Sequence, residues 1–353
     1  MDLGESIVFW YENNKRDLPW RTTKDPYHIW ISEIILQQTR VLQGIPYYLR
    51  FINRFPNIIA LANAPIDEIL NIWQGLGYYS RAHNMHYTAT YIMNNLGGKF
   101  PISFLELGKL KGIGDYTAAA IASICFEESV SVLDGNVIRV LSRLMGIFFL
   151  PSSPNNKIYY KKIANSLMST CVPSLFNQGI MEFGALVCKP VNPNCLDCPV
   201  NKYCSAYRND QVAFLPIKKP KIKQRERFFN YFILKENEHY IFQKRDNNDI
   251  WPGLLEFPLL ESKERLSWHE LTKFPHFPTY IMKSKNEDNP EFIEKTQILS
   301  HQKIYTRYWL ILGSLIKNKI PETFIRASEE NLNKYAFSKV THQLVIEFTR
   351  SEI

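Results

Sequence analysis

Apolar residues recur every three or four positions along most of the first two hundred residues of the chain. This spacing is typical of amphipathic helices, and Gly or Pro residues separate one apolar segment from the next. Helices are therefore predicted over residues 29–41, 65–73, 81–95, 117–126 and 137–147.

The pattern changes after residue 227. Shorter apolar segments between polar turns indicate strands, which we expect over residues 229–234, 240–245 and 304–315. Two further helices are expected, over 268–274 and near the C-terminus. The chain thus divides into a predicted helical domain (1–207), a linker (208–227) and an α+β domain (228–353).

The charge of the chain favours an anionic partner. Among 353 residues, 42 Lys and Arg face 34 Asp and Glu, a net charge of +8. Residues 216–227 hold six basic residues and one acid, so this linker is either a solvated tether or a segment that follows a phosphate backbone. No run of 18 apolar residues is present, and the first thirteen residues lack the pattern of a secretory signal, so we expect no membrane association.

Four cysteines gather in one short loop. Cys188, Cys195, Cys198 and Cys204 have the spacing Cys-x6-Cys-x2-Cys-x5-Cys. Four thiolates can surround an iron–sulfur cluster or a zinc ion, and zinc sites more often use two Cys-x2-Cys pairs. The spacing favours the cluster, with zinc as the alternative. All four positions are occupied by protein, so the site is expected to be structural.

A second motif is the glycine-rich turn at residues 110–114, which contains Lys111, Gly112 and Gly114. An Ala-rich helix follows it, and the free N–H groups at the start of a helix attract anions. The turn is either a phosphate clamp or a tight helix–helix connection that binds nothing.

Two carboxylates are candidates for catalysis. Glu33 is the only formally charged residue between Pro26 and Thr39, and a buried acid in such an apolar helix would stay protonated to higher pH. Asp134 precedes the helix at 137–147, where an N-cap position would keep it ionised. A neutral acid beside a fixed anion suits cleavage of a glycosidic bond. The plainer alternatives are a surface Glu and a simple cap.

These motifs together resemble those of the helix-hairpin-helix DNA glycosylases with an iron–sulfur loop. Within that superfamily the chain resembles the adenine DNA glycosylases (the MutY family). The specific matches are Leu-Pro-Trp-Arg at 18–21, Trp-Ile-Ser-Glu at 30–33 with Gln-Gln-Thr-Arg-Val at 37–41, Gly-Leu-Gly-Tyr-Tyr-Ser-Arg at 75–81 and Trp-Pro-Gly-Leu-Leu-Glu-Phe-Pro at 251–258. The resemblance implies a [4Fe-4S] cluster on the four cysteines.

The resemblance also implies roles for individual residues. Glu33 would protonate adenine and then activate water, and Asp134, supported by Asn136, would stabilise the cationic sugar. Tyr116 occupies the position of the lysine of strand-nicking relatives. A lysine could form a Schiff base with the sugar, which tyrosine cannot, so the enzyme is expected to remove the base and stop.

Further residues match the family's DNA and substrate contacts. Gln38 and Tyr78 match residues that wedge into the duplex when adenine is flipped out, although outside this context a solvated Gln and a core Tyr are the plainer interpretations. Trp20 and Arg21 match the adenine pocket. The expected contacts with substrate or DNA also include Thr39 and the hairpin residues Lys111, Gly112 and Gly114.

The second domain resembles the Nudix-like module with which the family reads 8-oxoguanine. It lacks the Glu-rich box of a Nudix hydrolase, because Leu259 stands six residues after Gly253 and no Arg-Glu-x2-Glu-Glu follows. The usual Phe-Ser-His recognition loop is best matched by Leu299-Ser300-His301, which makes Ser300 and His301 the candidate lesion-reading residues. A second candidate for this recognition loop is Phe-Ser-Lys at residues 337–339.

The sequence therefore predicts a monofunctional glycosylase that excises adenine opposite 8-oxoguanine or guanine. We expect a monomer that acts on double-stranded DNA in the bacterial cytoplasm, associated with the nucleoid. The alternatives are a relative that removes damaged pyrimidines or mismatched thymine, and a module that only binds DNA. The pyrimidine-specific relatives usually end soon after the cysteine loop, whereas this chain continues for about 150 residues.

Overall fold

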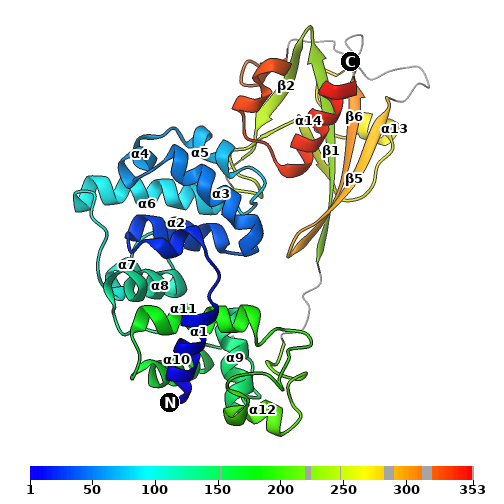
Figure 1. Cartoon of the computed structure of the whole chain (residues 1–353). Coiled ribbons are helices and arrows are strands. Elements are labelled where there is room, and N and C mark those ends of the chain that lie inside the picture. The colour runs from blue at the N-terminus through cyan, green and yellow to red at the C-terminus, as the bar shows by residue number, and fades with distance from the viewer. Residues whose placement is uncertain (152, 219–223, 247, 282–289, 312–319, 352–353) are drawn as a thin grey trace. The chain divides into compact units, whose positions relative to one another are not determined.

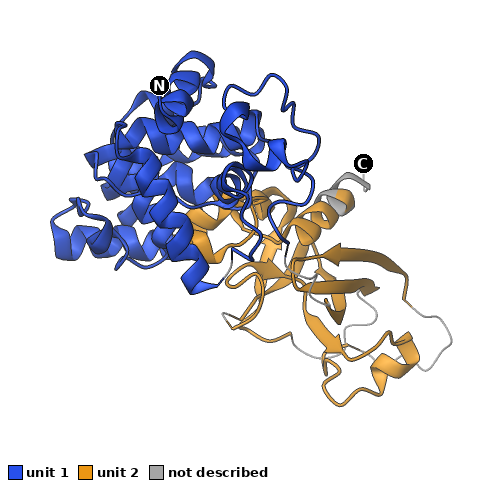
Figure 2. Ribbon diagram, turned by 90° about the horizontal axis from the view of Figure 1, so that it is seen from below, with its two compact units in different colours: residues 1–64, 84–220 blue, residues 65–83, 221–353 orange. Residues whose placement is uncertain are grey.

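The computed structural model forms two compact units. The first unit contains residues 1–64 and 84–220, and the second contains residues 65–83 and 221–353 (Figure 2). The structure describes the whole chain except residues 152, 219–223, 247, 282–289, 312–319 and 352–353. Within this described part, no helix combines the length and apolar character needed to cross a membrane.

The first unit is built from helices (Figure 1). They are α1 (Leu3–Asn14), α2 (Pro26–Leu36), α3 (Val41–Arg54), α4 (Ile58–Asn63), most of α6 (Ser80–Leu96), α7 (Phe104–Leu107), α8 (Asp115–Phe126), α9 (Gly135–Met145), α10 (Pro154–Met168), α11 (Pro173–Leu186) and α12 (Ser205–Arg208). Short 3-10 turns lie at Pro19–Thr22 and Asn201–Tyr203. The central helix α11 packs against α1, α8 and α9, and α8 packs against α2.

The boundaries of these helices follow local chemistry. Asp25 caps α2 through a bond from the Tyr27 amide, and Pro26 occupies the first turn, where its missing N–H is not needed. The predicted helix over 29–41 is too long, because α2 ends at Leu36 and Gln38 has a φ of +59°. That left-handed residue ends the helical hydrogen bonding, and α3 begins in a new direction.

The second unit is a mixed β-sheet between helices. Its strands are β1 (Arg225–Glu236), β2 (His239–Lys244), β3 (Leu255–Glu256), β4 (Leu259–Ser262), β5 (Phe292–Ile298), β6 (Gln302–Ile311) and β7 (Ile325–Ser328), and its helices are α5 (Ile66–Trp73), α13 (Trp268–Thr272) and α14 (Lys339–Ser351), with a 3-10 turn, η4, at Glu329–Lys334. The strand order is β3-β2-β1-β6-β5, in which β1 and β6 are parallel and the other neighbouring strands are antiparallel. Residues 312–315 of the predicted last strand lie outside the described residues.

The two faces of this sheet carry separate cores. Alternate β1 residues such as Phe229 and Tyr231 pack with Phe337 and Leu344 from the α14 end of the chain. The intervening residue Phe232 packs instead with a core that contains α13 residues. Because side chains of a strand alternate between faces, α13 and α14 cover opposite sides of the sheet.

Residues 65–83, which the sequence placed in the helical domain, belong structurally to the second unit. The Asn71 side chain donates a hydrogen bond to the Asn333 carbonyl at 2.7 Å, and the Tyr79 hydroxyl donates to the Phe337 carbonyl at 3.2 Å. Lys244 also pairs with Asp67 at 3.0 Å. These partners are far apart in the sequence, so the helical periodicity of 65–73 could not reveal them.

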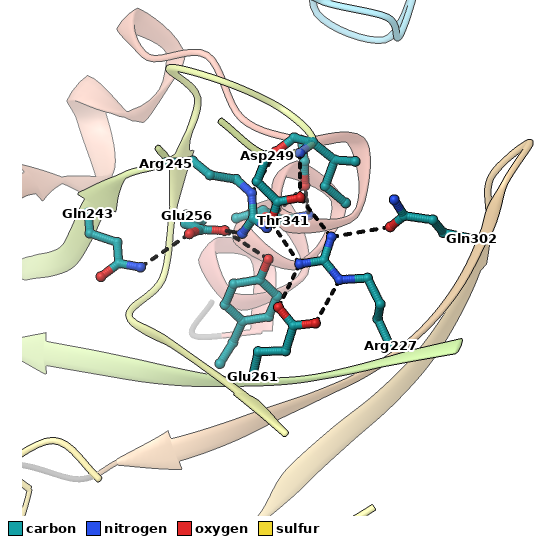
Figure 3. A network of polar contacts seen from close by, with 11 residues as sticks. Arg227, Gln243, Arg245, Asp249, Glu256, Glu261, Gln302 and Thr341 are labelled. Carbon is teal, nitrogen blue, oxygen red and sulfur yellow. Dashed lines mark hydrogen bonds and ion pairs between the residues drawn. The ribbon is translucent and has the colours of Figure 1, made fainter. Parts of the chain in front are cut away.

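The last residues of the predicted linker (208–227) belong to strand β1. Arg227 lies in β1 with only 7% of its side chain exposed, and it pairs with Asp249 at 2.7 Å and with Glu261 at 2.6 Å (Figure 3). Arg245 pairs with Asp249 at 2.6 Å and with the buried Glu256. A buried arginine is tolerated here because carboxylates neutralise it, and so this basic residue is part of a core network and not of a solvated tether.

Candidate active site

Glu33 lies on α2 and is almost completely buried, with 7% of the residue exposed. The hydroxyl of Tyr116, at the start of α8, donates a hydrogen bond to Glu33 Oε2 at 2.7 Å and also lies 3.3 Å from Met181 Sδ. The packing of α2 against α8 brings these two side chains together.

The environment of Glu33 favours its neutral form. Burial, and to a smaller extent the negative charge of Asp134, raise the pKa of this carboxyl from 4.5 to about 7. The hydrogen bond from Tyr116 and the charge of Arg21 act in the opposite direction but are outweighed. Glu33 therefore holds its proton up to about neutral pH.

Asp134 caps α9, as its position before that helix predicted. Its Oδ1 accepts from the Val137 amide at 2.7 Å, and its Oδ2 accepts from Asn136 Nδ2 at 2.8 Å. A cap alone would lower the pKa of Asp134, but burial has a larger, opposite effect and the net pKa lies above 3.8. The donors still fix both oxygens in place, and they are the groups that stabilise the ionised form.

One cavity of about 190 Å³, the catalytic pocket, brings these groups together. Of the residues that the sequence singled out, those that line it are Trp20, Arg21, Glu33, Thr39, Tyr116, Asp134 and Asn136. The acid and the anion therefore share one site, although they are a hundred residues apart in the chain.

A buried ion cluster forms another part of the pocket wall, and of its three members only Arg21 was predicted from the sequence. Glu182 of α11 is 2% exposed and pairs with Arg16 at 2.6 Å and with Arg21 at 2.9 Å. Burial raises the pKa of Glu182, but the hydrogen bonds from both arginines outweigh it and hold the pKa at about 2. Glu182 is the only charged residue of α11, so the criterion that singled out Glu33 would also have found it.

Arg139 holds the side chain of Asn136 in place. The Arg139 guanidinium donates to Asn136 Oδ1 at 2.9 Å, to the Gly184 carbonyl at 2.7 Å and to the Cys188 carbonyl at 2.8 Å. A Cβ added at Gly184 would lie 2.7 Å from the Asn136 Cβ, so glycine is required for this close approach of α9 and α11. The pocket and the first cysteine of the loop are thereby linked through one side chain.

The four loop cysteines line one small cavity and form no disulfide. The buried Arg143 donates to Cys188 Sγ at 3.4 Å and to the Lys189 carbonyl at 2.7 Å, which ties the loop to α9. Within the described residues, no group of three or more His, Cys, Asp or Glu side chains has the geometry that would hold a metal ion.

The two predicted wedge residues share an unusual backbone conformation. Gln38 and Tyr78 have φ angles of +59° and +46°, and both side chains are exposed. Such angles are uncommon for residues other than glycine and are often found at functional sites. The interpretation of Tyr78 as a core residue is wrong, because 53% of it is exposed.

The hairpin residues lie between α7 and α8, as predicted. Lys111 is exposed, and its ammonium group lies 4.5 Å from the centre of the Tyr87 ring. Gly112 has a φ of +80°, and a Cβ there would lie 2.7 Å from the Asn84 Cβ. Gly114 instead has an ordinary φ of −88° and caps α8 without a side chain, so the helix N-terminus is open to an anion.

In the second unit, residues 299–301 form the turn between β5 and β6. The side chain of Ser300 is exposed, and its hydroxyl lies 2.8 Å from the Tyr78 hydroxyl, within hydrogen-bonding distance. His301 is also exposed. The rival residues 337–339 cannot form a comparable loop, because Phe337 is fully buried and Ser338 is bonded to Thr341 at the start of α14.

The chain has clear relatives in sequence. A family model described as "HhH-GPD superfamily base excision DNA repair protein" matches residues 31–165. The adenine DNA glycosylase of Buchnera aphidicola subsp. Baizongia pistaciae (strain Bp) is 41% identical over 271 residues, which cover 75% of this chain and 76% of the relative. The adenine DNA glycosylase of Homo sapiens is 41% identical over 210 residues, 57% of this chain and 38% of that protein.

Solved structures are similar to the helical part. A thermostable thymine-DNA glycosylase superposes with a TM-score of 0.54 at 29% identity, covering 58% of this chain and 95% of its own. Endonuclease III in a non-covalent complex with DNA gives a TM-score of 0.51 at 19% identity, covering 59% and 94%, which shows a shared fold. The fold and the pocket thus define a helix-hairpin-helix glycosylase of DNA base-excision repair. Within that class, the chain belongs to the adenine DNA glycosylase family.

Proposed function

We propose that this enzyme excises adenine paired with 8-oxoguanine or guanine, by acid-assisted hydrolysis of the N-glycosidic bond. The observation that carries the proposal is the neutral Glu33, hydrogen-bonded to Tyr116 in the same pocket as Asp134. A protonated acid and an anion that share one pocket are what cleavage through an oxocarbenium-like sugar requires.

In this proposal Glu33 gives its proton to adenine N7. The C1′–N9 bond then breaks, its electron pair stays with adenine, and the sugar becomes cationic. Asp134, held by Asn136 and the Val137 amide, stabilises that cation. The ionised Glu33 takes a proton from the water that attacks C1′, which leaves an abasic site and restores the acid.

The reaction stops at the abasic site. Arg16 and Arg21 supply the only cationic side chains among the described residues that line the pocket, and no lysine is among them. Both guanidiniums are engaged with Glu182, and a guanidinium is not the free amine that a Schiff base requires. The Tyr116 phenol cannot form one either.

The ion cluster is suited to recognise adenine. Adenine presents an N6 amino group as a donor, and the Glu182 carboxylate, ionised because its pKa is held at about 2, is an acceptor. Trp20 and Ile29 provide apolar contacts for the base in the same pocket.

The cysteine loop is proposed to hold a [4Fe-4S] cluster. The four thiols come from one loop around one cavity, and a buried arginine stands beside Cys188 to offset thiolate charge. When bound, the cluster would stabilise the loop and not take part in catalysis, because the protein supplies all four ligands. Through Arg139 the loop also supports Asn136.

The base opposite adenine is proposed to be read by the second unit, a Nudix-like domain without the hydrolase box. Ser300 and His301 are exposed on the β5–β6 turn, and Ser300 lies beside Tyr78. Tyr78 and Gln38 would fill the space left by the flipped adenine. The open N-terminus of α8, with Gly112, Gly114 and Lys111, would bind a backbone phosphate.

The test uses purified protein and a labelled duplex with adenine opposite 8-oxoguanine. We expect an alkali-labile site at the adenine and no strand break without alkali. Glu33→Gln should lose at least a thousandfold in rate, whereas Glu12→Gln, an exposed residue of α1, should match the wild type. Excision of thymine or a damaged pyrimidine in place of adenine would support the alternative, and full activity of Glu33→Gln would refute the mechanism.

A further inference from the structure

A second cavity of about 520 Å³ lies beside the catalytic pocket within the first unit. It is formed by the end of α1, residues 15–24, the end of α8 and the start of α11. The two cavities have in common the wall residues Arg16, Trp20, Arg21, Ile124 and Gln178. Neither Glu33 nor Asp134 lines the second cavity, which therefore adjoins the pocket on the side away from the reacting carboxyl groups.

The wall between the cavities contains one neutral side chain that is free to turn. Arg16 and Arg21 are held in place by their ion pairs with Glu182, whereas Gln178 is long, uncharged and only partly buried, so it changes rotamer more readily. Gln178 accepts a hydrogen bond of 3.2 Å from the Tyr11 hydroxyl, and the Arg21 guanidinium lies 5.3 Å from the centre of the Tyr11 ring. Tyr11, which lines the second cavity, thus contacts two of the residues that separate it from the pocket.

The proposed reaction creates a need for a second opening. After cleavage the abasic sugar remains attached to the DNA beside Glu33 and Asp134, because no amine is present to break the strand. The free base lies deeper, against the wall of Arg21 and Glu182. If the pocket had one mouth only, adenine could leave only after the DNA.

We propose that free adenine leaves the catalytic pocket through the second cavity while the abasic duplex stays bound. This inference rests on the proposed function. The second cavity offers a planar base the ring of Tyr11, the Thr22 hydroxyl as an acceptor and the Thr23 hydroxyl as a donor, because the Thr22 proton is donated to the Pro19 carbonyl and Thr23 Oγ1 accepts from the Asp25 amide. The side-chain wall opens by rotation of Gln178 and closes again after the base has left, while Arg21 stays paired with Glu182.

The test compares three rate constants for the wild-type enzyme on a duplex with labelled adenine opposite 8-oxoguanine. Chemical quenching gives glycosidic cleavage, rapid filtration gives release of free adenine, and a competitor trap gives dissociation of the abasic duplex. We expect adenine to leave at least tenfold faster than the abasic duplex. Equal rate constants for adenine and duplex would overturn the proposal. Absence of cleavage would appear in the first measurement and would count against the proposed function itself.

Variants then locate the exit. Val172 and Thr22 are exposed residues that line only the second cavity, so Val172→Trp and Thr22→Trp narrow it without filling a core position. Each should slow adenine release at least fivefold and leave single-turnover cleavage within twofold. Leu105→Trp, an exposed position on α7 outside both cavities, is the control and should change neither. Wild-type release in both narrowed variants would contradict the proposed route.

Discussion

Replacing Glu33 with glutamine should abolish excision and at the same time stabilise the protein above neutral pH. In the folded state the pKa of Glu33 is raised from 4.5 to about 7, chiefly by burial. Between these pH values the unfolded chain releases this proton while the folded chain keeps it. The free energy of unfolding of the wild type therefore falls across this range because of Glu33.

The size of the effect follows from the same values. A pKa difference from 4.5 to about 7, at about 1.4 kcal/mol per pH unit, corresponds to about 3 kcal/mol. Glutamine is neutral at every pH and can still accept the hydrogen bond of Tyr116. The stability of Glu33→Gln relative to wild type should therefore be near zero at pH 4.5 and rise to about 3 kcal/mol at pH 8.

Urea unfolding at several pH values measures this difference in stability. Hydrogen exchange of the α2 amides then assigns the unfolding transition to the first unit. Glu127→Gln is the matched control, because Lys24 and Ser174 outweigh burial and lower the pKa of Glu127. That variant should be less stable than wild type at pH 8 and similar to it at low pH, the opposite sign. A stability difference for Glu33→Gln that does not change with pH would refute the reasoning.

Three other variants test separate parts of the site. Tyr116→Phe removes a hydrogen bond that lowers the pKa of Glu33, so the decline of the excision rate at high pH should move to higher pH in a pH–rate profile. Arg139→Lys loses the planar guanidinium that reaches Asn136 and two backbone carbonyls. The free energy of unfolding, measured in urea, should fall by about 1–3 kcal/mol, and excision should be slower. Ser300→Ala should reduce the ratio of excision rates opposite 8-oxoguanine and opposite guanine while leaving the rate opposite guanine within twofold, as measured in single-turnover assays.

The parts of the site that the sequence could predict depend on local features. Glu33 stands out as a single charge in an apolar helix, and Asp134 stands at the start of one, so their burial and capping follow from neighbouring residues. The cysteine spacing is equally local. The position of Glu33 and Asp134 in one pocket cannot be predicted from local features, because it depends on the packing of α2, α8, α9 and α11.

The features that could not be predicted from the sequence are contacts between residues that lie far apart along the chain. Arg16 and Glu182 are separated by 166 positions, so nothing near either one indicates the pair. Arg227 looks like part of a basic tether, because the carboxylates that neutralise it, Asp249 and Glu261, come 22 and 34 residues later. Residues 65–83 have the periodicity of any amphipathic segment, and only the structure shows that they pack with the second unit.

The central claim is that Glu33 carries the proton that adenine receives. The pH dependence of the single-turnover excision rate constant, on a duplex with adenine opposite 8-oxoguanine, tests it most directly. With a pKa of about 7 for Glu33, the rate constant should be level below that pH and fall about tenfold for each pH unit above it. A rate constant that stays level up to pH 9, or rises, would contradict the account.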